Sequence, residues 1–114
     1  MDDRYATQIS RLMDAVLASP GVTDPALRAA VAARVAALSA GETPPALDLP
    51  PALDRYLTTI ARHAYKITDD YIDALRQAGY SEDAIFELTL AAALGAGRRR
   101  LERGLAALRG EEQG

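Results

Sequence analysis

The chain of 114 residues has no cysteine, no tryptophan and a single histidine, His63. Without cysteine there is no disulfide, no thiolate metal ligand and no thiol nucleophile. One histidine is too few for a histidine-based metal cluster, so we expect neither a metal nor another cofactor. The chemistry open to this chain is therefore narrow.

Long apolar runs are also missing. None approaches the roughly 20 residues that a membrane-spanning helix needs. The N-terminus, Met1-Asp2-Asp3-Arg4-Tyr5, is acidic and lacks the apolar stretch of a signal peptide. We therefore expect a cytoplasmic protein that does not associate with membranes.

An excess of positive charge is the third absence. The formal net charge is −3, which gives no electrostatic reason to expect nucleic acid as a partner. A helical hairpin around Gly79 has the spacing of a helix-turn-helix unit. Its second helix, over residues 81–89, would carry three acidic residues and no basic one, and would repel phosphate. We therefore expect no binding of nucleic acid.

Apolar residues recur at helical spacing along the chain, and no alternating segment is typical of a strand. The pattern predicts an all-α fold, with residues 1–114 forming one domain of about five helices. We expect these helices at 3–18, 25–40, 51–66, 69–78 and 82–109, followed by a frayed tail at 110–114.

Capping residues support these boundaries. Asp24 is a good N-cap with Pro25 at the first helical position, and Thr68 and Ser81 are placed to cap two later helices. Gly79 is suited to end the helix before Ser81. Residues 41–51 hold four of the six prolines and predict an ordered connector without regular structure.

The fifth helix is unusually apolar. Between residues 84 and 97 its only charged residue is Glu87. A helix that is apolar on nearly all sides is normally buried, so this helix should be central or should face a second subunit. The latter option predicts a homo-oligomer. The small pairs Ala91/Gly95 and Ala93/Gly97 would let another helix approach closely, and Gly95→Ala should cost little, because helix propensity and crowding oppose each other.

The segment LDRYLTTIARHAYKITDDYIDALRQAGYSEDAIFELTLAAALGAGRRRLERGLAAL, residues 53–108, resembles the C-terminal half of the alkylhydroperoxidase-D-like (carboxymuconolactone decarboxylase-like) family. The Ala-Gly-Tyr-Ser run at 78–81 and Ile85 stand where the family pattern has them. The resemblance implies an alkylhydroperoxidase-D-like helical bundle.

Peroxidase members of that family use a glutamate, a C-x-x-C pair and a histidine to relay protons around a reactive thiolate. Those positions fall here among Ala29 and Ala30, in 41–45, and near Asp48. None of the four functional residues is present, so we expect no thiol peroxidase. The decarboxylase branch does not depend on thiols, but it would need an acid or base near the connector, where Glu42 and Asp48 are available.

Two further residues are candidates for acid–base chemistry. His63 is the only side chain with an unperturbed pKa near neutrality, and it is either a general base or a helix-surface histidine. Glu87 is a lone acid on an apolar helix. Burial would raise its pKa unless a cation such as Arg55 or Arg62 pairs with it in a structural role.

Four arginines gather near the end of the fifth helix, at 98, 99, 100 and 103. They form either an anion or acidic-partner site, or a solvated face with salt bridges. The spacing predicts that Arg98 pairs with Glu102.

The leading hypothesis is a catalytically silent, homo-oligomeric scaffold or interaction protein, with a further protein partner possible. The alternative is a thiol-independent carboxymuconolactone decarboxylase-like lyase that acts on a small carboxylate through Glu87, His63, Glu42 or Asp48. A concave site with convergent polar groups near 41–56 would favour the lyase.

Overall fold

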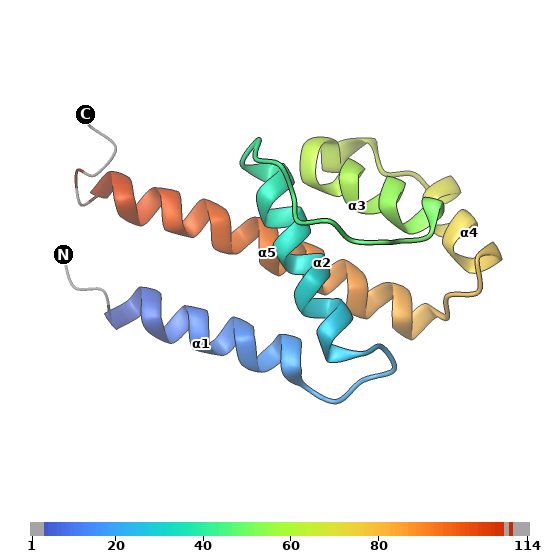
Figure 1. Cartoon of the computed structure of the whole chain (residues 1–114), viewed down its shortest axis with the longest axis horizontal. Helices are drawn as coiled ribbons and strands as arrows, with labels where there is room; N and C mark the ends of the chain where they lie inside the picture. The colour runs from blue at the N-terminus through green and yellow to red at the C-terminus, as the bar shows by residue number, and fades with distance from the viewer. Residues whose placement is uncertain (1–3, 109, 111–114) are drawn as a thin grey trace.

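The computed structural model describes residues 4–108 and 110, and within them it contains helices and no strand (Figure 1). The predicted all-α fold is confirmed. The helices are α1 (Arg4–Ala18), α2 (Pro25–Ser39), α3 (Pro51–His63), α4 (Asp69–Gln77) and α5 (Glu82–Leu108), with a short 3-10 helix, η1 (Ala64–Lys66). The expected frayed tail at 110–114 lies almost entirely outside the described residues.

The helix ends follow local signals in most places. Asp24 accepts a hydrogen bond from the Ala26 N–H at 2.9 Å, and Ser81 Oγ accepts one from the Ala84 N–H at 3.1 Å. Gly79 ends α4 with a φ of 101°. Thr68 occupies the N-cap position of α4, as predicted, but its side chain makes no capping hydrogen bond. There the backbone closes the first turn instead, because the Tyr71 N–H donates to the Thr68 carbonyl.

The third helix is shorter than predicted. It ends at His63, whose φ of −150° leaves the helical region, and residues 64–66 continue as a 3-10 turn. The connector that precedes it has no helix or strand over residues 42–50, as expected. Arg34 ties this connector to its surroundings, because it donates to the Pro45 carbonyl at 3.4 Å and to Asp54 Oδ1 at 3.0 Å.

α5 is the central helix of the fold, which is one of the two arrangements that its apolar sequence predicted. All four other α-helices pack against it, α2 most extensively. α2 and α5 approach each other closely at Gly95, where an added Cβ would clash with the Ala32 carbonyl oxygen. Only glycine allows the two backbones to come so near, so the expected packing role of Gly95 is confirmed. None of the helices in the described part is both long and apolar enough to cross a bilayer.

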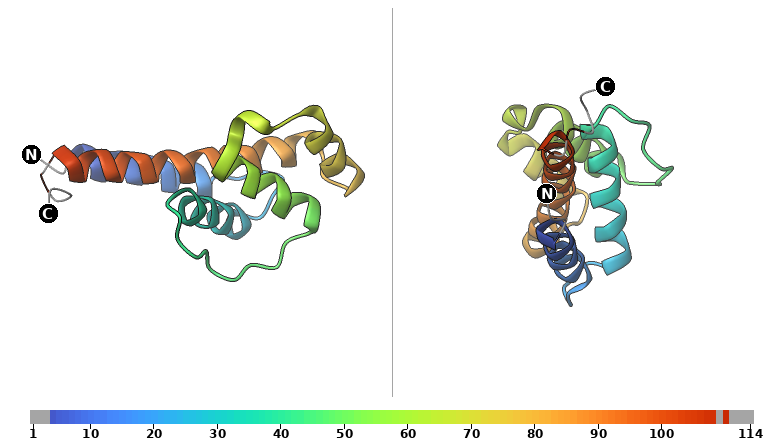
Figure 2. Two further views of the ribbon diagram at one scale, coloured as in Figure 1. Left: turned by 90° about the horizontal axis from the view of Figure 1, so that it is seen from above. Right: turned by 90° about the vertical axis from the view of Figure 1, so that its left-hand side faces the viewer.

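Two helices project beyond the core. α1 and the C-terminal half of α5 run antiparallel and side by side away from the other helices (Figures 1 and 2). The molecule is consequently elongated, with extents of 47 × 29 × 24 Å. Near the base of this projection Arg98 donates to the Ser10 carbonyl at 3.1 Å and to Asp14 Oδ1 at 2.6 Å.

Part of the surface of α5 is not covered. In the right-hand view of Figure 2, α2 lies to the right of α5, α1 lies below it, and the yellow-green segment from α3 to α4 lies to its upper left. Phe86 is 67% exposed and Leu90 is 38% exposed, and Ala93 on the same face is also exposed. α5 is thus apolar on nearly all sides without being buried on all sides within one chain. The small pair Ala91/Gly95 packs inside the domain, whereas Ala93/Gly97 does not.

Candidate functional site

The most concentrated polar site joins α5 to the loop between α1 and α2. The Glu87 carboxylate accepts hydrogen bonds from the Val22 N–H at 2.8 Å, the Thr23 N–H at 3.0 Å and the Thr23 hydroxyl at 2.6 Å. Both carboxylate oxygens are used. The site therefore fastens a loop that is far away in the sequence onto the central helix.

Arg28 stands beside this carboxylate. It lies on the core face of α2, at helical spacing from Val31 and Val35, and its side chain is only 6% exposed. Its guanidinium donates to the Ser19 carbonyl and, at 3.4 Å, to the Val16 carbonyl, at the C-terminal end of α1. Cations are favourable there because helix C-termini carry partial negative charge. Arg28 Nε lies 4.0 Å from Glu87 Oε1.

These contacts decide the protonation state of Glu87. The Thr23 hydroxyl, followed by the N–H groups of Val22 and Thr23, lowers the pKa of Glu87 to about 2, although burial acts in the opposite direction. The carboxylate is ionised at neutral pH and is a very weak base. The structural role predicted for Glu87 agrees with this geometry, but the predicted partners, Arg55 and Arg62, were wrong. The charge neighbour is Arg28.

Gly21 completes the site because it has no side chain that would collide with the Glu87 carboxylate. A Cβ at this position would come within 2.5 Å of Glu87 Oε1. Any side chain there would push the carboxylate away from the loop N–H groups. The loop sequence Pro-Gly-Val-Thr at 20–23 is therefore matched to a carboxylate that the primary structure places 64 residues later.

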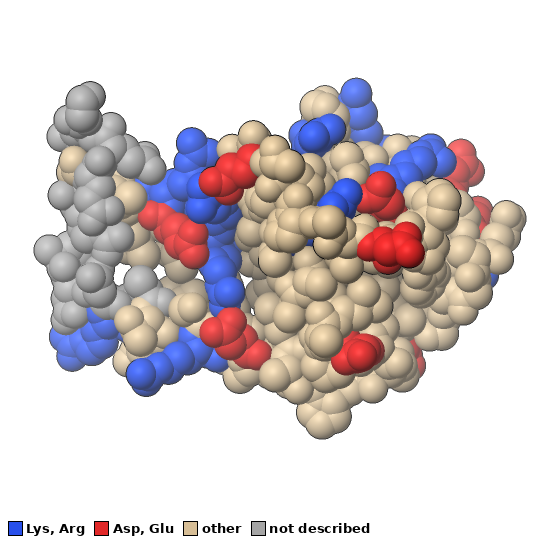
Figure 3. Space-filling model, viewed as in Figure 1, with Lys and Arg blue, Asp and Glu red and all other residues tan. Residues whose placement is uncertain are grey.

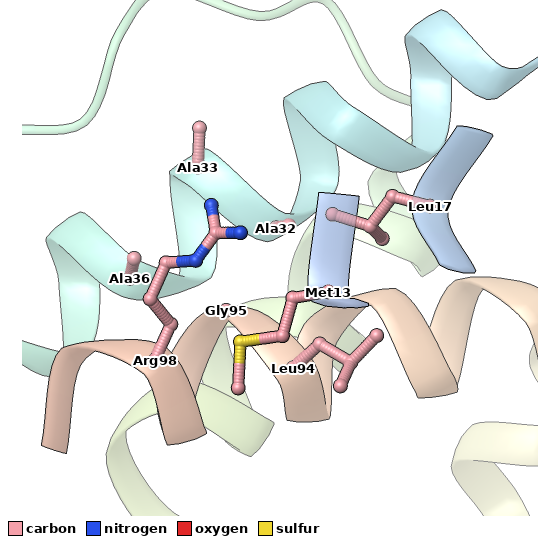
Figure 4. Close-up of a pocket in the computed structure, with 8 residues that line it drawn as sticks. All are labelled: Met13, Leu17, Ala32, Ala33, Ala36, Leu94, Gly95 and Arg98. Carbon is pink, nitrogen blue, oxygen red and sulfur yellow. The ribbon is translucent and has the colours of Figure 1, made fainter. Parts of the chain in front are cut away.

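The described residues include two small cavities. One of about 90 Å³ lies between α1, α2 and α5 (Figure 4), with lining residues Met13, Leu17, Ala32, Ala33, Ala36, Leu94, Gly95 and Arg98. Its only charged group, Arg98, is already bonded to Asp14. The other, of about 20 Å³, is next to Arg28 and Glu87 and has room for about one water molecule. Neither cavity is lined by any residue from 41–56.

The four candidate catalytic residues do not come together. The Glu87 side chain extends from α5 to the α1–α2 loop. His63 is exposed at the end of α3, where its ring lies 5.8 Å from the Tyr65 ring. Glu42 is exposed and pairs with Arg99 at 3.2 Å, and Asp48 is exposed in the connector. No hydrogen bond joins any two of these four described residues, and the described residues contain no cluster of His, Asp or Glu suited to a metal ion.

The arginine cluster forms salt bridges, but not the predicted one. Arg98 pairs with Asp14 on α1 at 2.6 Å, and it is Arg99 that approaches Glu102, at 3.7 Å. The Arg98–Glu102 prediction was wrong, because α1 brings a closer carboxylate that local spacing could not reveal. Basic and acidic side chains are mixed at this end of the molecule (Figure 3).

A second polar cluster joins α3, α4 and α5, and it was not predicted. The Tyr56 hydroxyl lies 2.7 Å from Thr89 Oγ1, and Arg55 lies 4.4 Å above the Tyr71 ring. A hydrogen bond from Thr59, helped by Arg55, lowers the pKa of Tyr71. The available signal was the spacing of Arg55 and Thr59, which places both on one face of α3 one turn apart.

Comparison with known proteins adds no assignment. No protein-family model, no curated protein and no solved structure matches this chain.

Proposed function

We propose that this chain is a homo-oligomeric scaffold or interaction protein without catalytic activity. The observation that carries the proposal is the exposed apolar face of α5, where Phe86 and Leu90 stand one helical turn apart. An apolar face on the central, most apolar helix is suited to binding another protein surface.

The arrangement of the ionisable groups supports catalytic silence. Glu87 is ionised and both of its oxygens hold the α1–α2 loop, so it is poorly placed to move a proton. His63, Glu42 and Asp48 lie apart from it. A lyase would need polar groups that converge on a cavity near 41–56, and the two described cavities are lined elsewhere.

A relation to the alkylhydroperoxidase-D-like family is part of the same proposal. Its support is that residues 53–108 form α3, α4 and α5 in the order of the family pattern, with the helix stop at Gly79 and the N-cap at Ser81. On this proposal the chain keeps the helical framework and lacks the thiol chemistry.

Two measurements test the proposed function. Native mass spectrometry and light scattering at micromolar concentration should report a homo-oligomer, and a monomer would contradict the proposal. With an alkyl hydroperoxide and a thiol reductant the protein should give no turnover above the rate without protein. Turnover that persists after metal chelation would overturn the claim of catalytic silence.

A further inference from the structure

Six residues form one continuous stripe along the uncovered side of α5. They follow each other at alternating steps of three and four residues, which keeps them on one face of a helix. In order, the stripe consists of Asp83, Phe86, Leu90, Ala93, Gly97 and Arg100. An acidic residue stands at its N-terminal end, a basic residue at its C-terminal end, and apolar or small residues lie between them. All are exposed except Gly97, which is partly exposed.

The stripe is complementary to the same stripe of a second copy that runs in the opposite direction. We propose that a second copy of this chain binds here, with the two α5 helices packed antiparallel about a two-fold axis that passes between Leu90 and Ala93. This inference rests on the proposed homo-oligomeric function and specifies its surface. In this register Asp83 faces Arg100 of the second copy, Phe86 faces its Gly97, and Leu90 faces its Ala93. Two-fold symmetry repeats every pair, as a closed dimer requires.

Charge is the first argument for a second copy as the occupant. Asp83 and Arg100 are exposed, and neither makes a salt bridge or a side-chain hydrogen bond with any other described residue. Their neighbours Glu82 and Arg99 are both paired within the chain. The antiparallel register would give each free charge an opposite one and would form two ion pairs at the rim of an apolar contact.

Size is the second argument. A Cβ added to Gly97 would meet nothing within 4 Å, so there is open space beside this residue. The register places the ring of Phe86, the largest side chain of the stripe, opposite that space. Leu90 is likewise opposite the small Ala93. Large residues thus face small ones along the whole contact, which lets two helices approach closely.

The remaining exposed apolar residues do not offer such a surface. Six large hydrophobic side chains are exposed among the described residues, and four of them lie on different elements: Leu12 on α1, Val22 in a loop, Tyr65 on η1 and Leu108 at the end of α5. Among the residues described, Phe86 and Leu90 alone lie one helical turn apart on a shared face. The stripe is therefore the surface that a partner would cover most effectively.

Charge reversal tests the register directly. Asp83→Arg and Arg100→Asp should each place like charges opposite one another twice per dimer and raise the dimer dissociation constant at least about tenfold. The double variant Asp83→Arg/Arg100→Asp should return the constant to within about threefold of the parent, because both pairs are rebuilt with opposite polarity. Sedimentation equilibrium of the full chain measures all four proteins.

Two matched controls accompany the reversals. Asp70→Arg changes another exposed acid at the second position of a helix, α4, so it reproduces the helix-dipole effect of Asp83→Arg away from the stripe. Arg62→Asp changes an exposed arginine in the last turn of α3, outside the stripe. Both should leave the dissociation constant within about twofold of the parent, and circular dichroism should show that every variant remains helical.

The outcomes separate the two proposals. Weakening by each reversal and recovery in the double variant support the antiparallel dimer. A parent oligomer that neither reversal weakens, or that the double variant does not restore, overturns this register but leaves the proposed scaffold in place. A parent chain that stays monomeric throughout overturns both.

The absence of cysteine allows a second test that does not depend on charge. Leu90→Cys and Ala93→Cys, mixed and exposed to oxidised glutathione, should form a disulfide-linked heterodimer faster than a mixture of Leu90→Cys with Ala29→Cys, since Ala29 is exposed on α2. Equal rates in the two mixtures would contradict the register.

Discussion

Gly95 and Gly97 stand two residues apart in the same helix and have opposite surroundings. Gly95 is pressed against the backbone of α2, where even a methyl group would lie 2.2 Å from the Ala32 carbonyl oxygen. Gly97 has open space where its side chain would be. Both lower helix propensity by about 1 kcal/mol relative to alanine. Within the monomer, close packing explains why position 95 is a glycine but does not explain the glycine at position 97. Packing against another molecule would explain the second glycine.

The contrast shows why α5 is difficult to interpret from composition. Its alanine, glycine and leucine residues are spread around the helix, so no polar face marks the side that meets solvent. Packing decides the difference. α1, α2, α3 and α4 cover one part of the circumference and leave the stripe from Asp83 to Arg100 open.

The largest effect is expected from Gly95→Leu. The side chain has to enter space that the Ala32 backbone fills, so α2 and α5 must separate and lose the contact around which the core forms. We expect a loss of about 3 kcal/mol or more in the free energy of unfolding, at the upper end of overpacking effects. Urea unfolding followed by circular dichroism measures it. A variant as stable as the parent would remove Gly95 from the α2 interface.

Glu87→Gln comes next. The amide has a single accepting oxygen, so its NH2 group has to replace one of the two carboxylate oxygens that accept from the loop, and Arg28 loses its carboxylate neighbour. We expect a clear fall in the urea midpoint, whereas Glu102→Gln, at an exposed pair on the same helix, should change it little.

The same variant predicts a pH dependence. Glu87 has its pKa lowered from 4.5 to about 2 in the folded chain, so its contribution is present above about pH 4.5 and is lost as the pH falls through 2. The stability difference between parent and Glu87→Gln should therefore be constant near neutrality and shrink between pH 4.5 and 2. A difference that grows on acidification would contradict the assigned contacts.

Gly95→Ala should have a smaller effect than Gly95→Leu, but still a destabilising one. From sequence alone this substitution should cost little, and the 2.2 Å approach to Ala32 corrects that expectation. The backbone has to shift, and the gain in helix propensity offsets only part of the strain. We expect a net loss of about 1 to 2 kcal/mol in urea unfolding. Equal or higher stability would mean that the helices separate without penalty.

Much of the fold could be predicted because its signals are local. Asp24 and Ser81 cap helices through bonds to residues two and three positions later, and Gly79 ends α4 through its own φ. The site could be predicted only in part. Glu87 could be identified from the sequence because it is a lone acid on an apolar helix. Its partners could not, because they come from a loop 64 residues away whose position depends on how α1 and α2 pack. Arg28 did give a signal, since it shares the apolar face of Val31 and Val35.

Gly97→Ala should have the smallest effect on the free energy of unfolding, and it should stabilise the monomer instead of destabilising it. A methyl group meets nothing within the chain, and alanine favours the helix, so the isolated monomer should gain about 0.5 to 1 kcal/mol. Gly104→Ala is the matched control, because it too has open space around it on α5. A loss of stability in dilute Gly97→Ala would show that position 97 is packed within the monomer.

Urea unfolding of Gly95→Ala and Gly97→Ala, each at a low and a high protein concentration, tests both faces of α5 together. Association stabilises a folded chain more as its concentration rises. The account predicts that Gly95→Ala is less stable than the parent at both concentrations. It predicts that dilute Gly97→Ala is more stable than the parent and gains less on concentration, because the methyl group fills the space reserved for Phe86 of the second copy. If both variants shift stability in the same direction, or if Gly97→Ala gains as much as the parent, α5 does not have one packed face and one face for a partner.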